Sequence, residues 1–312
     1  MNNLISGFSK IINDFPPNVH YNGWYEIVNN LTENIKLVSD GIILDTFIDY
    51  CLWTNKPILK SPWIGILHGV CMDCPTHKTK HNINDFLASD WFRLSKENCV
   101  AIVVLSEHTK NILKTKITIP VYSTHLPKSV GSKFNIENYF ASPKILHIGS
   151  HCRNFSAFIR FKTDILKNMI ISNRKLPHAL NCFTYNNITP SELCNVLISD
   201  NHLNNQQYES EICNSVGFSY YYDAAATNGL LEYIVSNTPI VVNRHPAIVE
   251  YIGEDYPLFY EDINHCPDNY LKSYEYIKKT VKYLENRAKM NIFKQESFNE
   301  FFKLLANNNM AN

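Results

Sequence analysis

The amino-acid sequence predicts an α/β fold of two domains, each built around a parallel sheet. Apolar runs of strand length alternate with stretches of helical periodicity along most of the chain, and this alternation is typical of parallel strands joined by helices. Residues 99–105 and 240–242 are almost continuously apolar, as strands covered on both faces are. A chain of 312 residues suits two domains of about 150 residues each.

The first domain is expected over residues 1–135, and its first 60 residues are the least informative part of the chain. Ser106 is the expected N-cap of a helix whose positive end carries Glu107. The expected elements are, in order, a helix over 24–37, strands over 41–45 and 63–67, a helix over 84–97, a strand over 99–105, a helix over 106–114 and a strand over 119–122.

The second domain is expected over residues 142–290, after a linker that polar residues and proline predict between 131 and 143. Most of the chain from residue 271 onward has helical periodicity. Before it, we expect strands over 144–150, 178–183, 216–222 and 240–242, and helices over 155–169, 191–199 and 230–235.

Composition excludes several classes of protein. The 29 basic and 29 acidic residues give a net charge of +0, so no global field favours nucleic acid as a partner. No apolar run approaches the roughly 18 residues that a membrane span needs, and the first residues do not have the pattern of a signal peptide. Nine scattered cysteines suit a reducing compartment, so we expect a cytoplasmic protein.

Four potential metal ligands, His68, Cys71, Cys74 and His77, recur at three-residue spacing. Structural zinc sites generally draw pairs of ligands from separated segments, and this chain has no second Cys-x-x-Cys pair. Four ligands on one short loop would also strain a tetrahedral site. We therefore expect no metal here.

The most informative segment covers residues 223–244. A short loop that begins with Asp223 leads into a helix that carries Glu232 near its start, and Pro239 follows the break before the strand over 240–242. A carboxylate on this apolar helix is costly to bury unless it is hydrogen-bonded. The two hydroxyls of a ribose are suitable donors, although a surface glutamate is the simpler alternative.

Together with residues 246–257, this segment resembles the nucleotide-sugar half of GT-B glycosyltransferases of the group 1, glycogen-synthase-like kind. In that family a glutamate-bearing helix precedes a small residue, Thr or Gly, Pro and a hydrophobic strand. The resemblance is strong over about 144–260, looser over 61–127 and absent from the first 60 residues. It implies two Rossmann-like domains with a cleft between them, and a C-terminal helix, 291–312, that packs back on the first domain.

The resemblance also implies an activity and a donor site. Such enzymes move a sugar from a nucleotide-diphosphate sugar to a hydroxyl of a glycan or other acceptor, and they need no metal or other cofactor. Glu232 would hold the ribose, close to Asn228 in the preceding loop. Gly149 and Ser150 follow a strand, as a phosphate-binding turn does. Arg153 would bind the diphosphate, and Arg244 is the competing candidate.

Two residues are candidates for the chemistry. His68 ends a strand of the first domain, where a neutral imidazole could take a proton from the acceptor or, once protonated, stabilise the leaving phosphate. Its alternative is a histidine satisfied by the edge of the sheet. Retaining members of the family often carry a glutamate where this chain has Ala224, so Asp223, one residue earlier, would replace it or would simply cap the loop.

Two other functions are compatible with the sequence. The departure at Ala224 favours a protein that kept the fold and binds a nucleotide sugar or glycan without reacting it. An epimerase that acts on a sugar nucleotide shares the architecture and would need the same donor site.

Overall fold

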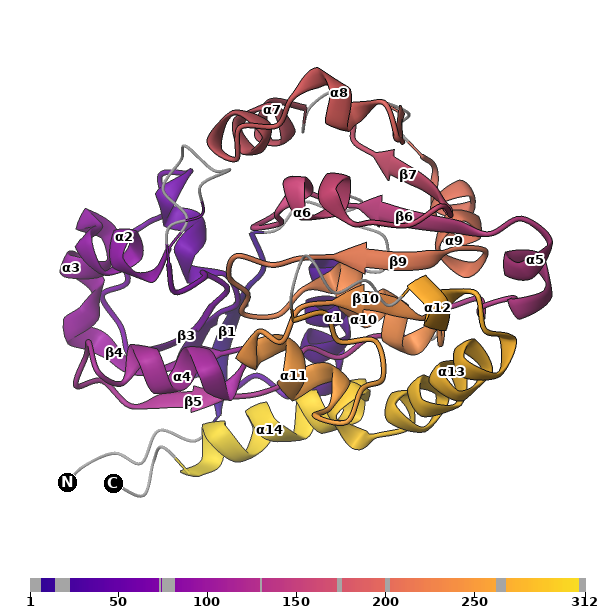
Figure 1. The fold of residues 1–312 in the computed structure, drawn as a ribbon. Helices are drawn as coiled ribbons and strands as arrows, with labels where there is room; N and C mark the ends of the chain where they lie inside the picture. The colour runs from indigo at the N-terminus through magenta and orange to yellow at the C-terminus, as the bar shows by residue number, and fades with distance from the viewer. Residues whose placement is uncertain are drawn as a thin grey trace. The chain divides into compact units, whose positions relative to one another are not determined.

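The computed structural model describes residues 7–14, 23–72, 74, 82–129, 131–172, 176–199, 203–261 and 268–308. The chain divides into two compact units, each with one five-stranded sheet (Figure 1). Unit 1 comprises residues 1–73, 80–129 and 291–312, and unit 2 comprises residues 74–79 and 130–290.

The sheet of unit 1 has the strand order β1-β2-β3-β4-β5, and all of its pairs are parallel. The last four strands lie where the sequence predicts them, and no element was predicted over the first. Its strands are β1 (Phe8–Ile12), β2 (Ile42–Asp45), β3 (Trp63–Leu67), β4 (Cys99–Val104) and β5 (Val121–Ser123).

One helical prediction in unit 1 was wrong in detail. The helix expected over 84–97 is divided at Ser89, whose hydroxyl accepts the backbone N–H of Phe92 at 3.2 Å and caps a new helix. The cap predicted at Ser106 is confirmed, since its hydroxyl accepts from the N–H of Thr109. The helical segments are α1 (Trp24–Asn34), η1 (Ile48–Leu52), α2 (Ile83–Ala88), α3 (Asp90–Ser95), η2 (Lys96–Asn98), α4 (Glu107–Leu113), η4 (Asn291–Phe293) and α14 (Gln295–Asn308).

The core of unit 1 packs large aromatic side chains against the sheet. Trp63 on β3 lies 5.4 Å from Trp91 between ring centroids, and Phe86 and Phe92 of α2 and α3 complete this cluster. Helix α14, from the far end of the chain, packs on α1, where Trp24 and Phe298 meet edge to face. Unit 1 is therefore assembled from segments far apart in the sequence.

The sheet of unit 2 has the order β10-β9-β6-β7-β8, again with all pairs parallel. Because all of these pairs are parallel, the carboxyl ends of the strands share one edge of the sheet (Figure 1). The strands are β6 (Lys144–Ile148), β7 (Leu166–Ile170), β8 (Val196–Ser199), β9 (Val216–Ser219) and β10 (Ile240–Val242).

Three predictions for unit 2 were wrong. The expected helix over 155–169 ends at Arg160 and is followed by β7. Lys167 is buried in β7, and its Nζ atom donates to the carbonyl oxygen of Ile159, near the end of that helix, at 2.6 Å. The expected strand over 178–183 is helical, because Ala179 and Cys182 are buried at helical spacing. Residues 191–199 contain one helical turn and then β8. The chain passes from unit 1 to unit 2 at residues 129 and 130, next to the expected linker over 131–143, and part of that segment is helical.

Helices complete unit 2. Its core contains a group of four buried aromatic side chains, Phe158, Phe161, Phe218 and Tyr260. The ring centroids of Phe161 and Phe218 lie 5.1 Å apart. The helices are α5 (Ile136–Ala141), α6 (Phe155–Arg160), α7 (Leu176–Tyr185), α8 (Pro190–Leu193), α9 (Asn205–Cys213), α10 (Asn228–Val235), α11 (Pro246–Ile252), α12 (Asp268–Leu271) and α13 (Tyr274–Ala288).

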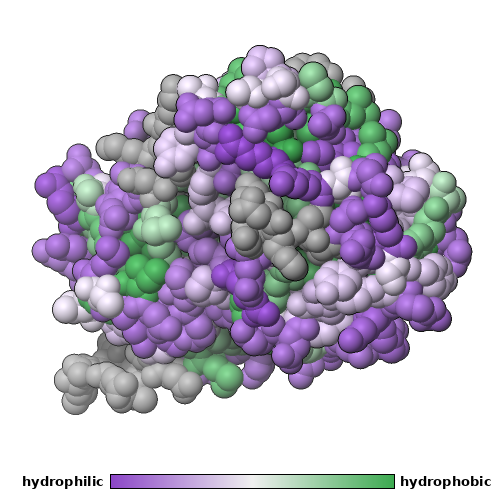
Figure 2. All heavy atoms as spheres, viewed as in Figure 1, coloured by the Kyte–Doolittle hydropathy of each residue, from purple (hydrophilic) through white to green (hydrophobic). Residues whose placement is uncertain are grey.

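On the face drawn in Figure 2, hydrophilic residues predominate and hydrophobic ones form small groups between them. Among the described helices, none combines the length and the apolar character that crossing a membrane requires.

Candidate active site

Helix α10 holds Glu232 in a buried position. Thr227 is its N-cap, and the Thr227 hydroxyl accepts the backbone N–H of Leu230 at 3.3 Å. The Glu232 side chain is satisfied by a hydrogen bond in which the hydroxyl of Tyr208, on α9, donates to its Oε2 atom. Burial and the neighbouring carboxylate raise the pKa of Tyr208 well above its usual value, so this hydroxyl stays a donor. Sequence reasoning missed Tyr208, which lies 24 residues before Glu232 on another helix.

Arg153 lies inside unit 2 rather than on its surface. Its guanidinium donates from Nη1 to the carbonyl of Ile148 and from Nη2 to the Tyr221 hydroxyl at 3.3 Å. The Nε atom is buried without a partner among the described residues. An arginine held in this way braces the turn after β6, and its side chain is not presented outward.

Two glycines make room for that guanidinium. Gly149 has φ +90°, and a Cβ atom there would lie 1.5 Å from Nη1 of Arg153. A Cβ atom at Gly229, on α10, would lie 2.5 Å from Nη2. The sequence explained Gly149 by close approach to a phosphate, but in the structure the space beside it contains Arg153. Ser150 is buried in the same turn, and its carbonyl accepts the N–H of Arg153 at 3.4 Å.

Backbone hydrogen bonds tie the ends of three strands together at this edge. After β6 and β9, the N–H of Tyr222 donates to the carbonyl of Cys152 at 2.9 Å, and that of Asn154 donates to Tyr220 at 2.7 Å. After β10, the side chain of Asn243 bonds both backbone groups of Tyr221, at 2.8 and 2.9 Å. The loops that carry the predicted residues of unit 2 are therefore fixed against one another.

Asp223 and His245 form a buried pair at the same edge. Asp223 is 1% exposed, and its Oδ1 atom accepts the N–H of Ala224 at 2.8 Å. The same oxygen lies 3.0 Å from Nε2 of His245, the residue that precedes α11. Sequence reasoning did not single out His245. The signal was present, since a histidine directly before the proline that begins a helix occupies the N-cap position.

The remaining candidates of unit 2 differ in their surroundings. Arg244 forms ion pairs with Glu254 at 2.9 Å and Glu261 at 2.6 Å, and its guanidinium lies over the ring of Phe259. Its charge is thus already balanced by two exposed carboxylates. Asn228 begins α10, and its Oδ1 atom is buried without a hydrogen-bond partner among the described residues. This acceptor could receive a donor from a ligand.

In unit 1, His68 follows β3 and is enclosed by aromatic rings. It lies 4.3 Å from Trp24 and 4.4 Å from Phe47 between ring centroids. Its Nε2 atom is 3.1 Å from the carbonyl of Thr46, and because a carbonyl only accepts, Nε2 carries the proton. Burial lowers the pKa of His68 to about 4. The ring is therefore neutral at physiological pH, a state that permits the role of a base.

Two buried aspartates lie close to His68, and the sequence did not predict either of them. Asp49 accepts the backbone N–H of His68 at 3.0 Å, and burial raises the pKa of Asp49 to about 7. Asp45 pairs with Lys56 at 2.7 Å, and Lys56 also contacts Asp14 at 2.8 Å. The carboxyl edge of the first sheet therefore gathers titratable groups, as the second does.

The metal hypothesis rested on four residues, of which His77 lies outside the described ones. Cys74 forms a hydrogen bond with the thiol of Cys152. This bond and burial raise the pKa of Cys152 above its usual range, so its thiol is neutral.

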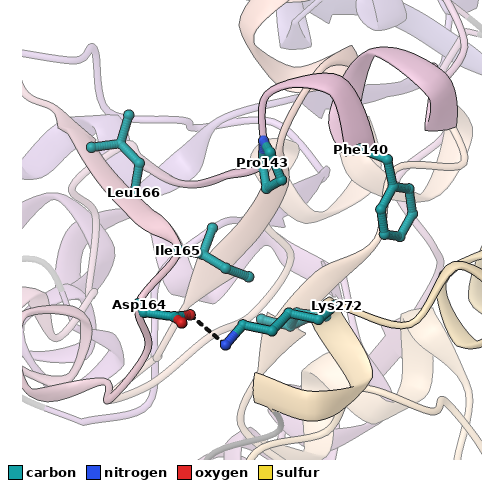
Figure 3. Close-up of a pocket in the computed structure, with 7 residues that line it drawn as sticks. Phe140, Pro143, Asp164, Ile165, Leu166 and Lys272 are labelled. Atoms are coloured by element: carbon teal, nitrogen blue, oxygen red, sulfur yellow. Dashed lines mark ion pairs between the residues drawn. The ribbon is translucent and has the colours of Figure 1, made fainter.

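A hollow of about 330 Å³ opens at the opposite edge of the second sheet, where β6 and β7 begin (Figure 3). Asp164 and Lys272 form an ion pair at its rim, and Figure 3 shows apolar side chains around it. Its lining residues are Phe140, Pro143, Asp164, Ile165, Leu166, Leu271 and Lys272. It contains none of the predicted site residues.

Comparison with solved structures shows the fold. The chain is similar to a sucrose-phosphate synthase from Thermosynechococcus elongatus, with a TM-score of 0.62 and 10% identity over 85% of this chain and 72% of that one. A glycosyltransferase from Rickettsia africae has a TM-score of 0.54 and 12% identity, over 96% of this chain and 85% of that one. The pneumococcal O-GlcNAc transferase GtfA, solved with UDP and GlcNAc, has a TM-score of 0.53 and 10% identity, over 92% of this chain and 60% of that one. This chain therefore spans less than two thirds of the length of GtfA.

These matches bear out the predicted α/β fold of the GT-B kind with two Rossmann-like units. No protein-family model matches the chain, and no curated protein matches its sequence.

Proposed function

We propose that the protein is a glycosyltransferase that moves a sugar from a nucleotide-diphosphate sugar to a hydroxyl of a glycan or other acceptor, without a metal. The observation that carries the proposal is Glu232, a buried carboxylate held by Tyr208 at the carboxyl edge of a parallel sheet. Open α/β sheets bind ligands at this edge. A carboxylate there is suited to the two hydroxyls of a ribose.

The remaining groups have roles that follow from their surroundings. Asn228 and the backbone amides at the start of α10 would contact the donor, because helix N-termini attract anions. Asp223 would face the transferred sugar, and neutral His68 would act on the acceptor hydroxyl. Arg153 would support the diphosphate site indirectly, by fixing the turn that contains Gly149 and Ser150. Arg244 would need to leave its two glutamates to reach a phosphate.

The experiment that tests the proposal is a thermal-shift screen of nucleoside diphosphates and nucleotide sugars. UDP is the first nucleotide to try, since GtfA was solved with it. Ligand at ~100 times its dissociation constant adds about 2.7 kcal/mol to the stability of the folded protein. Glu232→Gln should reduce that affinity by about 1.5–3 kcal/mol, typical of a hydrogen bond to a charged group.

Glu275→Gln, an exposed position on α13, is the matched control and should bind like the wild type. Equal affinity of the Glu232→Gln variant and the control for every nucleotide that binds would remove Glu232 from the donor site.

A binding protein without catalysis is the second candidate, and Ala224 favours it. The side chain at this position is a buried methyl group, 1% exposed, where retaining members of the resembled family often have a glutamate. Slow release of free sugar from a nucleotide sugar without acceptor would support the enzyme, and binding without release would support the second candidate. An epimerised product would indicate the epimerase-like alternative.

We also propose a cytoplasmic location. Cys51, Cys99, Cys182, Cys194 and Cys213 are free thiols, which suits a reducing compartment.

A further inference from the structure

His245 makes two hydrogen bonds with different partners. Its Nδ1 atom accepts the backbone N–H of Ala247 in the first turn of α11, at 3.3 Å. Its Nε2 atom lies 3.0 Å from Oδ1 of Asp223, in the loop after β9. The side chains of His245 and Asp223 are 11% and 1% exposed. The imidazole therefore joins two segments that lie 22 residues apart in the sequence.

These contacts determine the tautomer of the ring. Because Nδ1 accepts a hydrogen bond from Ala247, it carries no proton, and the proton of the neutral ring is on Nε2. That N–H donates to the carboxylate of Asp223. Asp223 Oδ1 thus receives two donors, the ring of His245 and the backbone of Ala224, and its position is fixed.

A role as helix cap alone does not account for a histidine at this position. Capping needs one acceptor, and Ser, Thr, Asp and Asn are the preferred residues. The imidazole adds a second nitrogen, and this atom reaches the buried carboxylate. Histidine is thus suited to hold both groups at once.

We infer that His245 is a positioning residue that fixes the Asp223 carboxylate toward the transferred sugar, next to Ala224, where retaining members of the resembled family often carry a glutamate. This inference rests on the proposed function. A carboxylate stabilises developing positive charge best when it is already oriented before reaction. Asp223 and His245, from two different loops, thus provide an oriented carboxylate, as a glutamate at position 224 would from a single side chain.

Two conservative variants separate the contacts of His245. In His245→Asn, the amide oxygen can still accept from Ala247, but the side chain is too short to reach Asp223. In His245→Gln, the amide nitrogen takes the place of Nε2 and can donate to Asp223. Turnover of UDP-glucose and UDP-N-acetylglucosamine, measured as release of UDP, is compared with the melting temperature and the affinity for UDP.

We expect His245→Asn to melt like the wild type, to bind UDP equally well and to lose about 10²-fold in turnover, as misplacement of a reacting group does. His245→Gln should recover most of that loss. Asp223→Asn should lose at least as much as His245→Asn, and the double variant should lose no more than Asp223→Asn, since both changes remove one unit. Wild-type turnover in folded His245→Asn would overturn the inference.

A measurement that does not depend on turnover distinguishes this inference from the proposed function. Nitrogen chemical shifts of the His245 ring should show the Nε2–H tautomer in the wild type, and this signal should change in Asp223→Ala. If the wild-type protein neither binds UDP nor releases it from these two nucleotide sugars, the proposed function is wrong for these donors. The tautomer of His245 still decides whether its hydrogen bond to Asp223 exists. A ring protonated on Nδ1 alone would overturn the inference in either case.

Discussion

At the scale of single residues, the sequence singled out two acids that are buried in the structure, but not the residues that form hydrogen bonds with them. Glu232 and Asp223 were predicted because each belongs to a local pattern, a helix face or the loop after a strand. Tyr208 and His245 were not, because hydrogen bonds to residues 24 and 22 positions away leave no trace in a local pattern. The surroundings of Arg153 were not predicted either. Its position after a glycine turn favoured phosphate binding, whereas its guanidinium is buried against Ile148 and Tyr221.

Asp49 provides a test of residue-scale electrostatics. Its carboxyl has a folded pKa of about 7, raised by burial from an ordinary 3.8. Between these values the folded state retains a proton that the unfolded state has lost, so stability falls as pH rises from about 4 to 7. Asp49→Asn removes this titration and can still accept the N–H of His68. The melting temperature of Asp49→Asn relative to wild type should therefore rise from pH 4 to 7 and stay constant above pH 7.

Asp40→Asn, at an exposed position of the same unit, is the control and should show a nearly constant difference across this range. A constant difference for Asp49→Asn as well would mean that the Asp49 pKa is not raised in the folded state.

At the scale of elements, predictions succeeded where the sequence of a segment was compatible with a strand alone, and failed where it was compatible with both a strand and a helix. The apolar runs that became β4, β6 and β10 have no helical alternative of sufficient length. The segment 155–169 was also compatible with a helix, and it includes Lys167, which is buried in β7. Lys167 is compatible with the strand only because carbonyls at the end of α6 accept hydrogen bonds from its ammonium group. Such compensation depends on packing and is not visible in a local window.

The junction between β6 and α10 yields a prediction for these two elements. Alanine normally favours a helix over glycine by about 1 kcal/mol, so Gly229→Ala would stabilise α10 if space allowed. Its Cβ would instead meet Arg153 Nη2 at 2.5 Å, and that guanidinium cannot move without losing its bond to Tyr221. We expect Gly229→Ala to reduce the free energy of unfolding by about 1–3 kcal/mol, as overpacking does.

The same change made together with Arg153→Ala should cost much less or become stabilising. Denaturant unfolding of the four proteins of this double-mutant cycle measures the coupling. An equal cost of Gly229→Ala in both backgrounds would show that Arg153 does not occupy this space.

At the scale of the whole molecule, the fold was predictable although several elements were not. A helix replaces the expected strand at 178–183, and a strand replaces part of the expected helix at 191–199. Strands and helices still alternate along the chain, so these local errors do not change the predicted fold class. The resemblance added what periodicity could not, namely the kind of two-unit fold that the solved structures then showed. Strand β1 was missed because its mixture of apolar and polar residues, FSKII, lacks a continuous apolar run.

The return of the chain to unit 1 gives the last prediction. On α14, Phe298 is 1% exposed and packs 6.1 Å from Trp24 of α1, and Asn299 donates to Asn30 at 2.9 Å. Truncating a buried phenylalanine costs about 3–5 kcal/mol. Because α14 belongs to unit 1, Phe298→Ala should reduce hydrogen-exchange protection in β1–β5 and leave that of β6–β10 unchanged. Leu304→Ala, on the exposed face of the same helix, should leave both sheets as in the wild type. Equal loss of protection in both sheets would mean that the two units unfold as one.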